Sequence, residues 1–397
     1  MAGKNVYPYR TAAGQRWRVK GMVRLPDGTA REINKRGFVT KTAAVDWLKA
    51  AQVDGKREGY IEPSRQRLGA YGAEVIAGLR LKPQTAASYR KNWRNHIESY
   101  PLAALPLAQL TGVKLTAHYR VLEKSGRKDH RAGEPLSART TRYVHVIIHR
   151  VLHQAVKDGL LARNPADAAT PPTAREARPP EMTCWSTAQL ALFLGWAAEN
   201  SASSPLWHVL AMTGMRRGEL LALRWRDFSA DEAALAIRRS AGMVRTLGEG
   251  AEMVEDSTKT GKPRVIDLDP ATVAVLKSWK MRRGEMALRL ARPDALIVGD
   301  LEDAHRNGEH VSRQFARDIA RCRETPGGAA LPSIRLHDLR HGHASVLLTS
   351  GVPVHVVSER LGHASAVITL QVYAHVLPGS QREAADRFAA LVEGAAR

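Results

Sequence analysis

The side chains best suited to chemistry in this chain of 397 residues gather in residues 335–375. His337 and Arg340 stand three positions apart, His363 follows a leucine and a glycine, and Tyr373 comes ten positions after that histidine. Residues i and i+3 share one face of a helix, so an imidazole and a guanidinium can point at one anion. We therefore expect a bound phosphate in this stretch.

Each of these residues also fits an ordinary structural role. A histidine and an arginine three positions apart usually form a solvated helix face, and His363 could simply cap a helix. Tyr373 is flanked by apolar residues and would then be a core residue with its hydroxyl at the surface. A chemical role for the group therefore requires partners from elsewhere in the chain.

A first partner is Arg216, in the stretch TGMRRGELLALRWRDF that begins at Thr213. Thr213 and Gly214 are expected to end one helix, and Arg216 begins the next. The helix dipole disfavours a cation at this end, so an anion shared by Arg216 and the helix terminus would explain its position. An ion pair with Glu219 explains that position equally well.

A second partner is Lys259. Strands are expected over residues 252–257 and 264–268, and the sequence TKTGKP between them is typical of a hairpin turn with Lys259 near its tip. A lysine at a hairpin tip is either solvated or reaches a phosphate. Lys262 lies three residues away in the same turn and is the alternative.

The charge of the chain indicates an anionic partner. Its 60 Lys and Arg residues against 39 Asp and Glu give a net charge of +21, which favours an anionic polymer or a membrane surface. We recognise no run of about 18 apolar residues and no secretory signal, so the membrane alternative is weaker. Cys184 and Cys322 form neither a disulfide framework nor a metal motif, so a cytoplasmic, reducing location is expected.

Composition and turn signals divide the chain into residues 1–60, 61–165, 166–181 and 182–397. The first part carries 13 Lys and Arg against 5 Asp and Glu. Extended runs on either side of a Pro-Asp-Gly turn, followed by a helical pattern, predict a small three-stranded sheet with one helix. Its basic character predicts contact with DNA, and a solubilising module is the alternative.

The second part is expected to be helical. Tyr89, Trp93 and Ile97 share one helix face, and Ser137 caps a longer helix whose apolar residues recur at three- and four-residue spacing. Residues 166–181 are rich in alanine and proline and lack apolar periodicity. They are predicted to be an extended linker.

The last part is expected to combine helices with short strands. Ser186 and Gln189 have the spacing of a capping box at the start of a helix, and Ser312 is expected to cap another helix. A final helix is expected over residues 381–392, with Phe388 and Leu391 on its apolar face.

Five motifs follow one another over about 160 residues: TGMR with GE, STKTG, HDLRH, LGH and VYAH. Together they resemble the tyrosine recombinases of the phage integrase family. The resemblance implies a multidomain, mainly helical fold with small sheets. Its expected parts are an arm-type DNA-binding domain over residues 1–60, a helical core-binding domain over 61–165, a linker over 166–181, and an α+β catalytic domain with a C-terminal helical tail over 182–397.

By that resemblance, six residues form the active site: Arg216, Lys259, His337, Arg340, His363 and Tyr373. The tyrosine would attack the scissile phosphorus and form a 3′-phosphotyrosyl bond. The two arginines would hold the non-bridging oxygens, and His363 would hydrogen-bond the phosphate. His337 would take the tyrosine proton, and Lys259 would protonate the leaving 5′ oxygen. No acidic cluster suited to metal ions is visible, so no metal or other cofactor is expected.

The implied activity is that of a site-specific DNA recombinase that integrates or excises a phage or another mobile element. Its expected partners are double-stranded DNA with core-type and arm-type sites, further copies of the chain in a tetramer, and an accessory DNA-bending or directionality factor. A non-cleaving architectural DNA-binding protein and a type IB-like topoisomerase are the alternatives. The final helix is expected to pack in its own protomer or, as in the family, to dock on a neighbouring one, which we favour.

Overall fold

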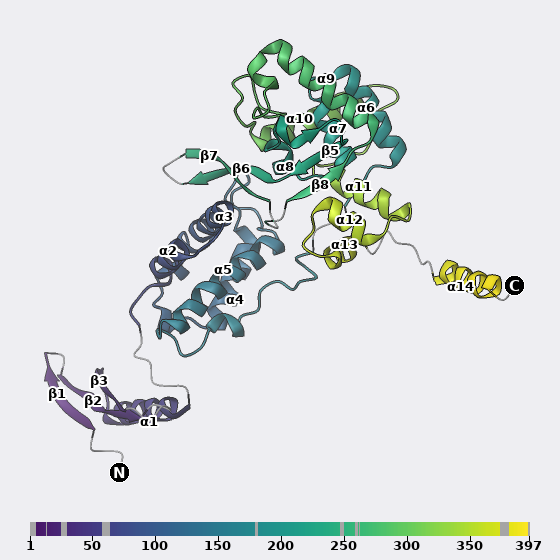
Figure 1. Ribbon diagram of the computed structural model, residues 1–397. Helices are drawn as coiled ribbons and strands as arrows, with labels where there is room; N and C mark the ends of the chain where they lie inside the picture. Colours follow the sequence, from purple (N-terminus) through teal and green to yellow (C-terminus); the bar gives the residue numbers. More distant parts are fainter. Residues whose placement is uncertain are drawn as a thin grey trace. The chain divides into compact units, whose positions relative to one another are not determined.

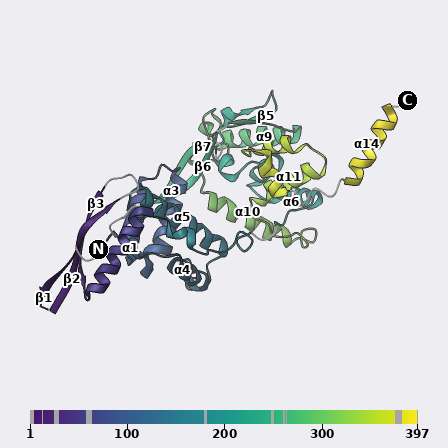
Figure 2. The ribbon, with the colours of Figure 1, turned by 90° about the horizontal axis from the view of Figure 1, so that it is seen from below.

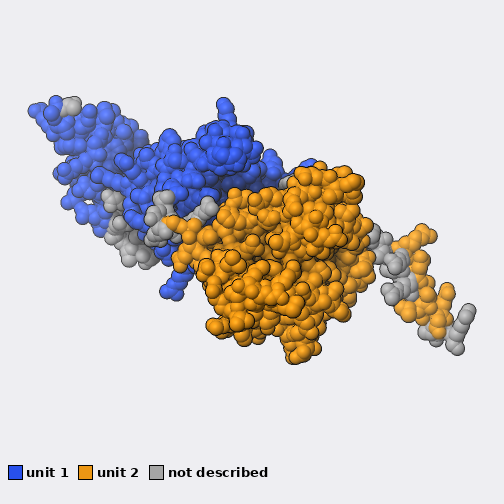
Figure 3. All heavy atoms as spheres, turned by 90° about the horizontal axis from the view of Figure 1, so that it is seen from above, with its two compact units in different colours: residues 1–179 blue, residues 180–397 orange. Residues whose placement is uncertain are grey.

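A computed structural model describes residues 5–12, 14–24, 30–57, 64–178, 182–246, 250–258, 261, 263–373 and 381–395. The chain divides into two compact units, Met1–Pro179 and Pro180–Arg397, which Figure 3 shows in blue and orange. Across the described residues, no helix has both the length and the apolar character needed to cross a bilayer.

The first unit begins with the expected three-stranded sheet and its helix. The antiparallel strands β1 (Val6–Thr11), β2 (Gly14–Arg24) and β3 (Ala30–Phe38) are followed by α1 (Lys41–Arg57). Figures 1 and 2 both show α1 lying along this sheet. Val19, Ile33 and Leu48 are buried between the sheet and α1 because strand residues alternate faces, which leaves many of the basic residues exposed.

The second part of this unit is helical, as predicted. Its main helices are α2 (Leu68–Gly78), α3 (Pro83–Trp93), α4 (Gly112–Ser125) and α5 (Ala138–Lys157). Short turns complete it: a π-helical turn at Arg94–Glu98 and 3-10 turns at Pro101–Ala104, Leu107–Gln109 and Pro165–Ala168.

The predicted apolar face of α3 is buried in the core of the helical part. Trp93 packs against α2 at Gly72, where a Cβ atom would lie only 1.9 Å from the indole. Only glycine permits this close approach. The Ser137 hydroxyl accepts a hydrogen bond from the Thr140 amide and caps α5, as predicted.

The first residues of the predicted linker are not an extended spacer. Ala166, in the 3-10 turn, is buried, and the Thr170 amide donates to the Thr116 hydroxyl of α4. The Arg142 guanidinium of α5 donates to the Pro172 carbonyl at 2.8 Å. Residues up to Pro172 therefore belong to the helical part, because tertiary hydrogen bonds hold a segment that shows no periodic pattern.

The second unit contains a helical layer around a core that includes Trp207, Trp225 and Phe315. Its helices are α6 (Thr187–Asn200), α7 (Ser204–Thr213), α8 (Arg217–Leu221), α9 (Pro270–Met286) and α10 (Gly308–Arg323), with 3-10 turns at Trp225–Asp227 and Leu288–Ala291. The capping box of Ser186 and Gln189 is present, as predicted.

The predicted cap at Ser312 is wrong. Helix α10 begins at Gly308, and the Asn307 side chain accepts a hydrogen bond from the Glu309 amide. Ser312 therefore lies inside the helix, where its hydroxyl accepts a hydrogen bond from Arg217.

The predicted hairpin around Lys259 is also wrong. Strand β7 (Gly250–Ser257) pairs with β6 (Arg239–Thr246), whereas β8 (Arg264–Asp267) pairs with β5 (Ala234–Ile237). A short strand, β4 (Phe228–Ser229), completes the second sheet. Leu235 of β5 and Ile266 of β8 are paired and buried in the core, which holds β8 in the second sheet. The segment between β7 and β8 therefore connects two different sheets. Lys259 and Lys262 themselves lie outside the described residues.

The C-terminal helices are α11 (Asp338–Thr349), α12 (Val354–Leu361), α13 (Ala366–Tyr373) and α14 (Gln381–Ala395). Helices α11, α12 and α13 pack side by side (Figure 1) around Leu348, Val357 and Leu361. Gly362 ends α12 in the left-handed conformation, as expected for the glycine before His363.

Candidate active site

The base of the candidate site is a buried carboxylate shared by two arginines. Glu219, 1% exposed, accepts hydrogen bonds from the Arg216 side chain at 2.9 Å and from both terminal nitrogens of Arg264 at 3.1 and 2.7 Å. Burial alone would raise the pKa of this carboxyl, but Arg264 and then Arg216 hold it below its usual value. Glu219 is therefore the ionised counter-charge of both guanidinium groups.

These arginines also tie distant segments to the site. Arg216 Nη2 donates to the Gly362 carbonyl at 3.0 Å, which joins the start of α8 to the turn that carries His363. Arg264 Nε donates to the Arg360 carbonyl at 3.0 Å. The ion pair between Arg216 and Glu219, one of the two interpretations of this arginine, is therefore confirmed, and the shared anion stays a prediction. Our reading of the sequence missed Arg264, whose only signal is an arginine at the start of an apolar strand.

Arg340 of α11 is the most unusual cation of the site. It is 3% exposed, its Nη1 atom donates to the Gly214 carbonyl at 2.8 Å, and its buried Nη2 atom has no hydrogen-bond partner in the described part of the chain. Burial and then the nearby Arg216 lower the pKa of this guanidinium to about 9. A bound anion would stabilise this guanidinium, because it is buried beside other cations and has an unpaired donor.

The two predicted histidines lie within electrostatic reach of these arginines. His337 stands at the N-cap of α11, and burial together with the charges of His341 and Arg340 lowers its pKa to about 4. Burial and the charges of Arg340 and Arg216 lower the pKa of His363 to about 4 as well. His363 Nδ1 lies 2.8 Å from the Thr369 hydroxyl. Both imidazoles are therefore neutral near pH 7 and suited to proton acceptance or neutral hydrogen bonding.

Tyr373 lies at the last described position of α13 and is 1% exposed. Its hydroxyl lies 2.7 Å from Nδ1 of His341, a residue to which the sequence motifs assigned no role. Burial raises the pKa of Tyr373 to about 12, against the opposing effect of Arg340. The structure therefore brings Arg216, Arg340, His337, His363 and Tyr373 into one electrostatically coupled group.

Lys259, the sixth predicted residue, lies outside the described residues. In the described part of the chain, no group of three or more His, Cys, Asp or Glu side chains is arranged to hold a metal ion.

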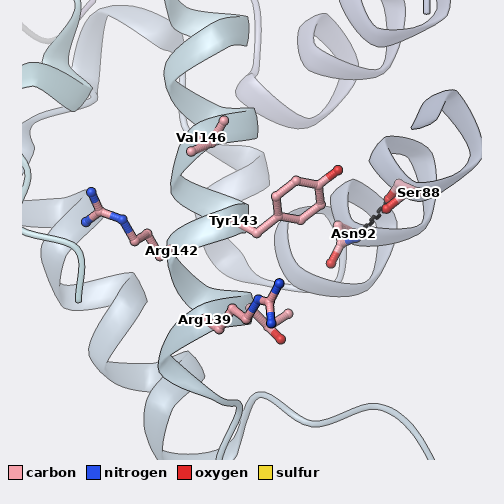
Figure 4. Close-up of a pocket in the computed structure, with 7 residues that line it drawn as sticks. Ser88, Asn92, Arg139, Arg142, Tyr143 and Val146 are labelled. Atoms are coloured by element: carbon pink, nitrogen blue, oxygen red, sulfur yellow. Dashed lines mark hydrogen bonds between the residues drawn. The ribbon is translucent and has the colours of Figure 1, made fainter. Parts of the chain in front are cut away.

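The helical part of the first unit carries a separate polar hollow of about 480 Å³ between α3 and α5. In Figure 4, Tyr143 of α5 points toward Ser88 and Asn92 of α3. Guanidinium and amide groups are those that proteins use to contact phosphates and base edges. The hollow is lined by Ser88, Asn92, Arg139, Thr140, Arg142, Tyr143 and Val146.

Comparisons with known proteins identify relatives of this chain. Residues 197–379 match the phage integrase family. The chain is 23% identical to the tyrosine recombinase XerC-like protein of Caldanaerobacter subterraneus subsp. tengcongensis, over 84% of this chain and 88% of that protein.

Two solved structures share the fold. One is the Tn1549 transposon integrase in complex with a circular intermediate DNA, with a TM-score of 0.67, 18% identity, and coverage of 81% of this chain and 99% of that one. The other is a lambda integrase tetramer bound to a Holliday junction, with a TM-score of 0.52, 15% identity, and coverage of 94% and 95%. The family match places residues 197–379 in the phage integrase family, and the recombinase relative supports a tyrosine recombinase.

Proposed function

We propose that this recombinase is a site-specific integrase that cuts and rejoins DNA strands to integrate or excise a phage or another mobile element. The observation that carries this proposal is the buried, unpartnered Nη2 atom of Arg340 close to Arg216 and Tyr373. A DNA phosphate would satisfy that atom and bring phosphorus to the tyrosine. The transposon origin of one structural relative, whose structure contains a circular intermediate DNA, supports a mobile element as the substrate.

In the proposed reaction, Tyr373 Oη attacks the scissile phosphorus, and the bond to the 5′ oxygen breaks to leave a 3′-phosphotyrosyl intermediate. Arg216 and Arg340 hold the non-bridging oxygens as negative charge accumulates on them, and His363 adds a hydrogen bond. The hydroxyl proton passes to a neighbouring imidazole, for which the motif favours His337. The second proton, for the leaving 5′ oxygen, is assigned to Lys259.

The remaining parts of the chain are proposed to hold the DNA. The basic sheet of residues 1–60 would bind arm-type sites, and the helical part, 61–165, would bind core-type sites with the polar hollow of α3 and α5 against the duplex. Residues 182–397 would perform catalysis in the cytoplasm. An accessory DNA-bending or directionality factor is the expected further partner.

A suicide DNA substrate, in which the cleaved 5′ end diffuses away, tests the proposed chemistry. We expect the wild-type protein to form a covalent complex that survives denaturing electrophoresis and Tyr373→Phe to form none, because phenylalanine lacks the attacking oxygen. The integrity of the variant is checked by its circular dichroism and by DNA binding.

Three other results would contradict the proposal. A covalent complex in Tyr373→Phe would exclude this nucleophile. Binding or bending of DNA without any nicking of supercoiled plasmid would favour an architectural protein. Relaxation of plasmids that lack a recombination site, without strand exchange between duplexes, would favour a topoisomerase.

Helix α14 is proposed to dock on a neighbouring protomer in a DNA-bound tetramer. Phe388, Leu391 and Val392 are 70%, 68% and 54% exposed, so their apolar face is free to dock on another surface. A chain ending at Gly379 is expected to lose cooperative assembly on a two-site DNA more than binding to a single site. Mobility-shift titrations measure both, and Arg382→Ala, an exposed polar change on the same helix, is the control. Equal losses in the two titrations would place the helix within its own protomer.

A further inference from the structure

The hydrogen bond between α11 and α13 points to a second active-site histidine. We propose that His341, rather than His337, positions the Tyr373 hydroxyl and accepts its proton through Nδ1 when the tyrosine attacks phosphorus. This inference rests on the proposed function. It concerns which imidazole activates the nucleophile, which neither the motifs nor the comparisons assign.

The geometry singles out His341. Its Nδ1 atom lies 2.7 Å from Tyr373 Oη, and the ring centroids are 5.8 Å apart. A general base must lie within hydrogen-bond reach of the proton that it removes. The rings of His337 and His341 meet edge to face at 4.9 Å, as expected for positions i and i+4 at the start of a helix. His337 therefore packs against the His341 ring, whereas His341 makes the hydrogen bond to the tyrosine.

The charges around His341 suit a base that becomes cationic only during the reaction. Burial lowers the pKa of His341, so it is neutral near pH 7 before the reaction, and Asp338 on the same helix opposes this shift. The Asp338 carboxylate would therefore stabilise the imidazolium once it forms. Three charged groups on or next to α11 influence His341: Asp338, Arg340 and Arg335. Arg340 and Cys184, which lies before α6, influence Tyr373. His337 and His363 lie within electrostatic reach of His341.

Each proton that moves in the step has a donor and an acceptor among these groups. The Oη–H bond of Tyr373 breaks, the proton moves to Nδ1 of His341, and the oxygen forms a bond to phosphorus. The bond from phosphorus to the 5′ oxygen breaks, and that oxygen receives a proton from the general acid assigned to Lys259. On rejoining, the 5′ hydroxyl returns its proton to the group assigned to Lys259 and attacks phosphorus. The phosphotyrosyl bond breaks, and the proton on His341 returns to the tyrosine oxygen.

The test is the single-turnover rate of covalent complex formation on a suicide DNA between pH 6 and pH 10. Glutamine can accept the hydrogen bond but not the proton, so His341→Gln is expected to lower the rate at pH 7 by about 10²- to 10⁴-fold. The wild-type rate should be nearly level from pH 7 upward, because the pKa of His341 is lowered and the imidazole is already neutral there. The variant rate should rise with pH across the whole range, because hydroxide must then ionise a tyrosine whose pKa is about 12.

Two further variants separate a proton acceptor from a merely structural residue. His355→Gln, an exposed histidine on α12, is the matched control and should react at the wild-type rate. His341→Ala is expected to regain activity when imidazole is added, because the added base can occupy the vacated position. A substrate with sulfur in place of the leaving 5′ oxygen needs no general acid, and it should leave the His341→Gln defect unchanged.

A rate for His341→Gln within about twofold of wild type at pH 7, a factor worth less than 0.5 kcal/mol, would overturn the inference. So would a wild-type pH profile in that variant, or a defect in His341→Ala that imidazole does not relieve. In each case the absence of trapping in Tyr373→Phe would leave the proposed function intact. If the wild-type protein itself formed no covalent complex, the proposed function would fail and the inference with it.

Discussion

Replacing Arg340 by alanine is expected to lower the rate of covalent complex formation by about 10³-fold, because removal of one preorganised donor to a developing oxyanion typically costs 10²- to 10³-fold. Its Nη2 atom is buried and has no partner among the described residues, and the guanidinium lies within electrostatic reach of Arg216 and Tyr373. Single-turnover trapping at saturating protein measures the rate, and mobility shifts measure DNA binding, which should change far less.

Thermal unfolding distinguishes this role from a structural one. A buried guanidinium with an unsatisfied donor and cationic neighbours destabilises the DNA-free protein, so Arg340→Ala should unfold at an unchanged or higher temperature. Arg340→Lys should stay slow because an ammonium cannot hold two phosphate oxygens in a fork. Arg313→Ala, an exposed arginine on α10, is the control. A lower unfolding temperature together with a trapping rate within tenfold of wild type would contradict the prediction.

Replacing Glu219 by alanine is expected to cost about 3 to 5 kcal/mol of unfolding free energy, the usual result of breaking a buried ion pair on one side. This carboxylate accepts hydrogen bonds from Arg216 and Arg264, and its loss leaves both guanidinium groups without their counter-charge. Urea unfolding followed by tryptophan fluorescence measures the change. Glu232→Ala, an exposed glutamate before β5, should have little effect.

The pH dependence of unfolding provides a second test of Glu219. Its pKa is lower in the folded state than in the unfolded state, so its stabilising contribution is fully present above the unfolded value and is lost as pH falls through the folded one. Glu219→Gln should therefore lose less stability than the wild type below about pH 4.5. An unchanged acid dependence in Glu219→Gln, or a loss below about 1 kcal/mol in the alanine variant, would mean that solvent already screens both arginines.

The sequence alone was sufficient for features that depend on neighbouring residues. Serines at helix starts, such as Ser137 and Ser186, cap the helices as predicted, because the hydroxyl and the amide that it satisfies lie within three residues. Apolar residues at helical spacing marked the buried faces of α3 and α5. The order of the short motifs also led to the family, since each motif is a local pattern.

Only the tertiary structure decided how distant segments pair. Strands β5 and β6 follow each other closely in the chain, yet they join different sheets, and local pattern cannot reveal this because both partners of each pair have suitable alternation. Arg264 reaches Glu219 across 45 positions, and His341 meets Tyr373 across 32. Such contacts depend on which helix faces pack together. The motifs therefore predicted a set of phosphate-binding residues, while the contacts that Glu219 and His341 make with Arg216, Arg264 and Tyr373 became visible only in the folded chain.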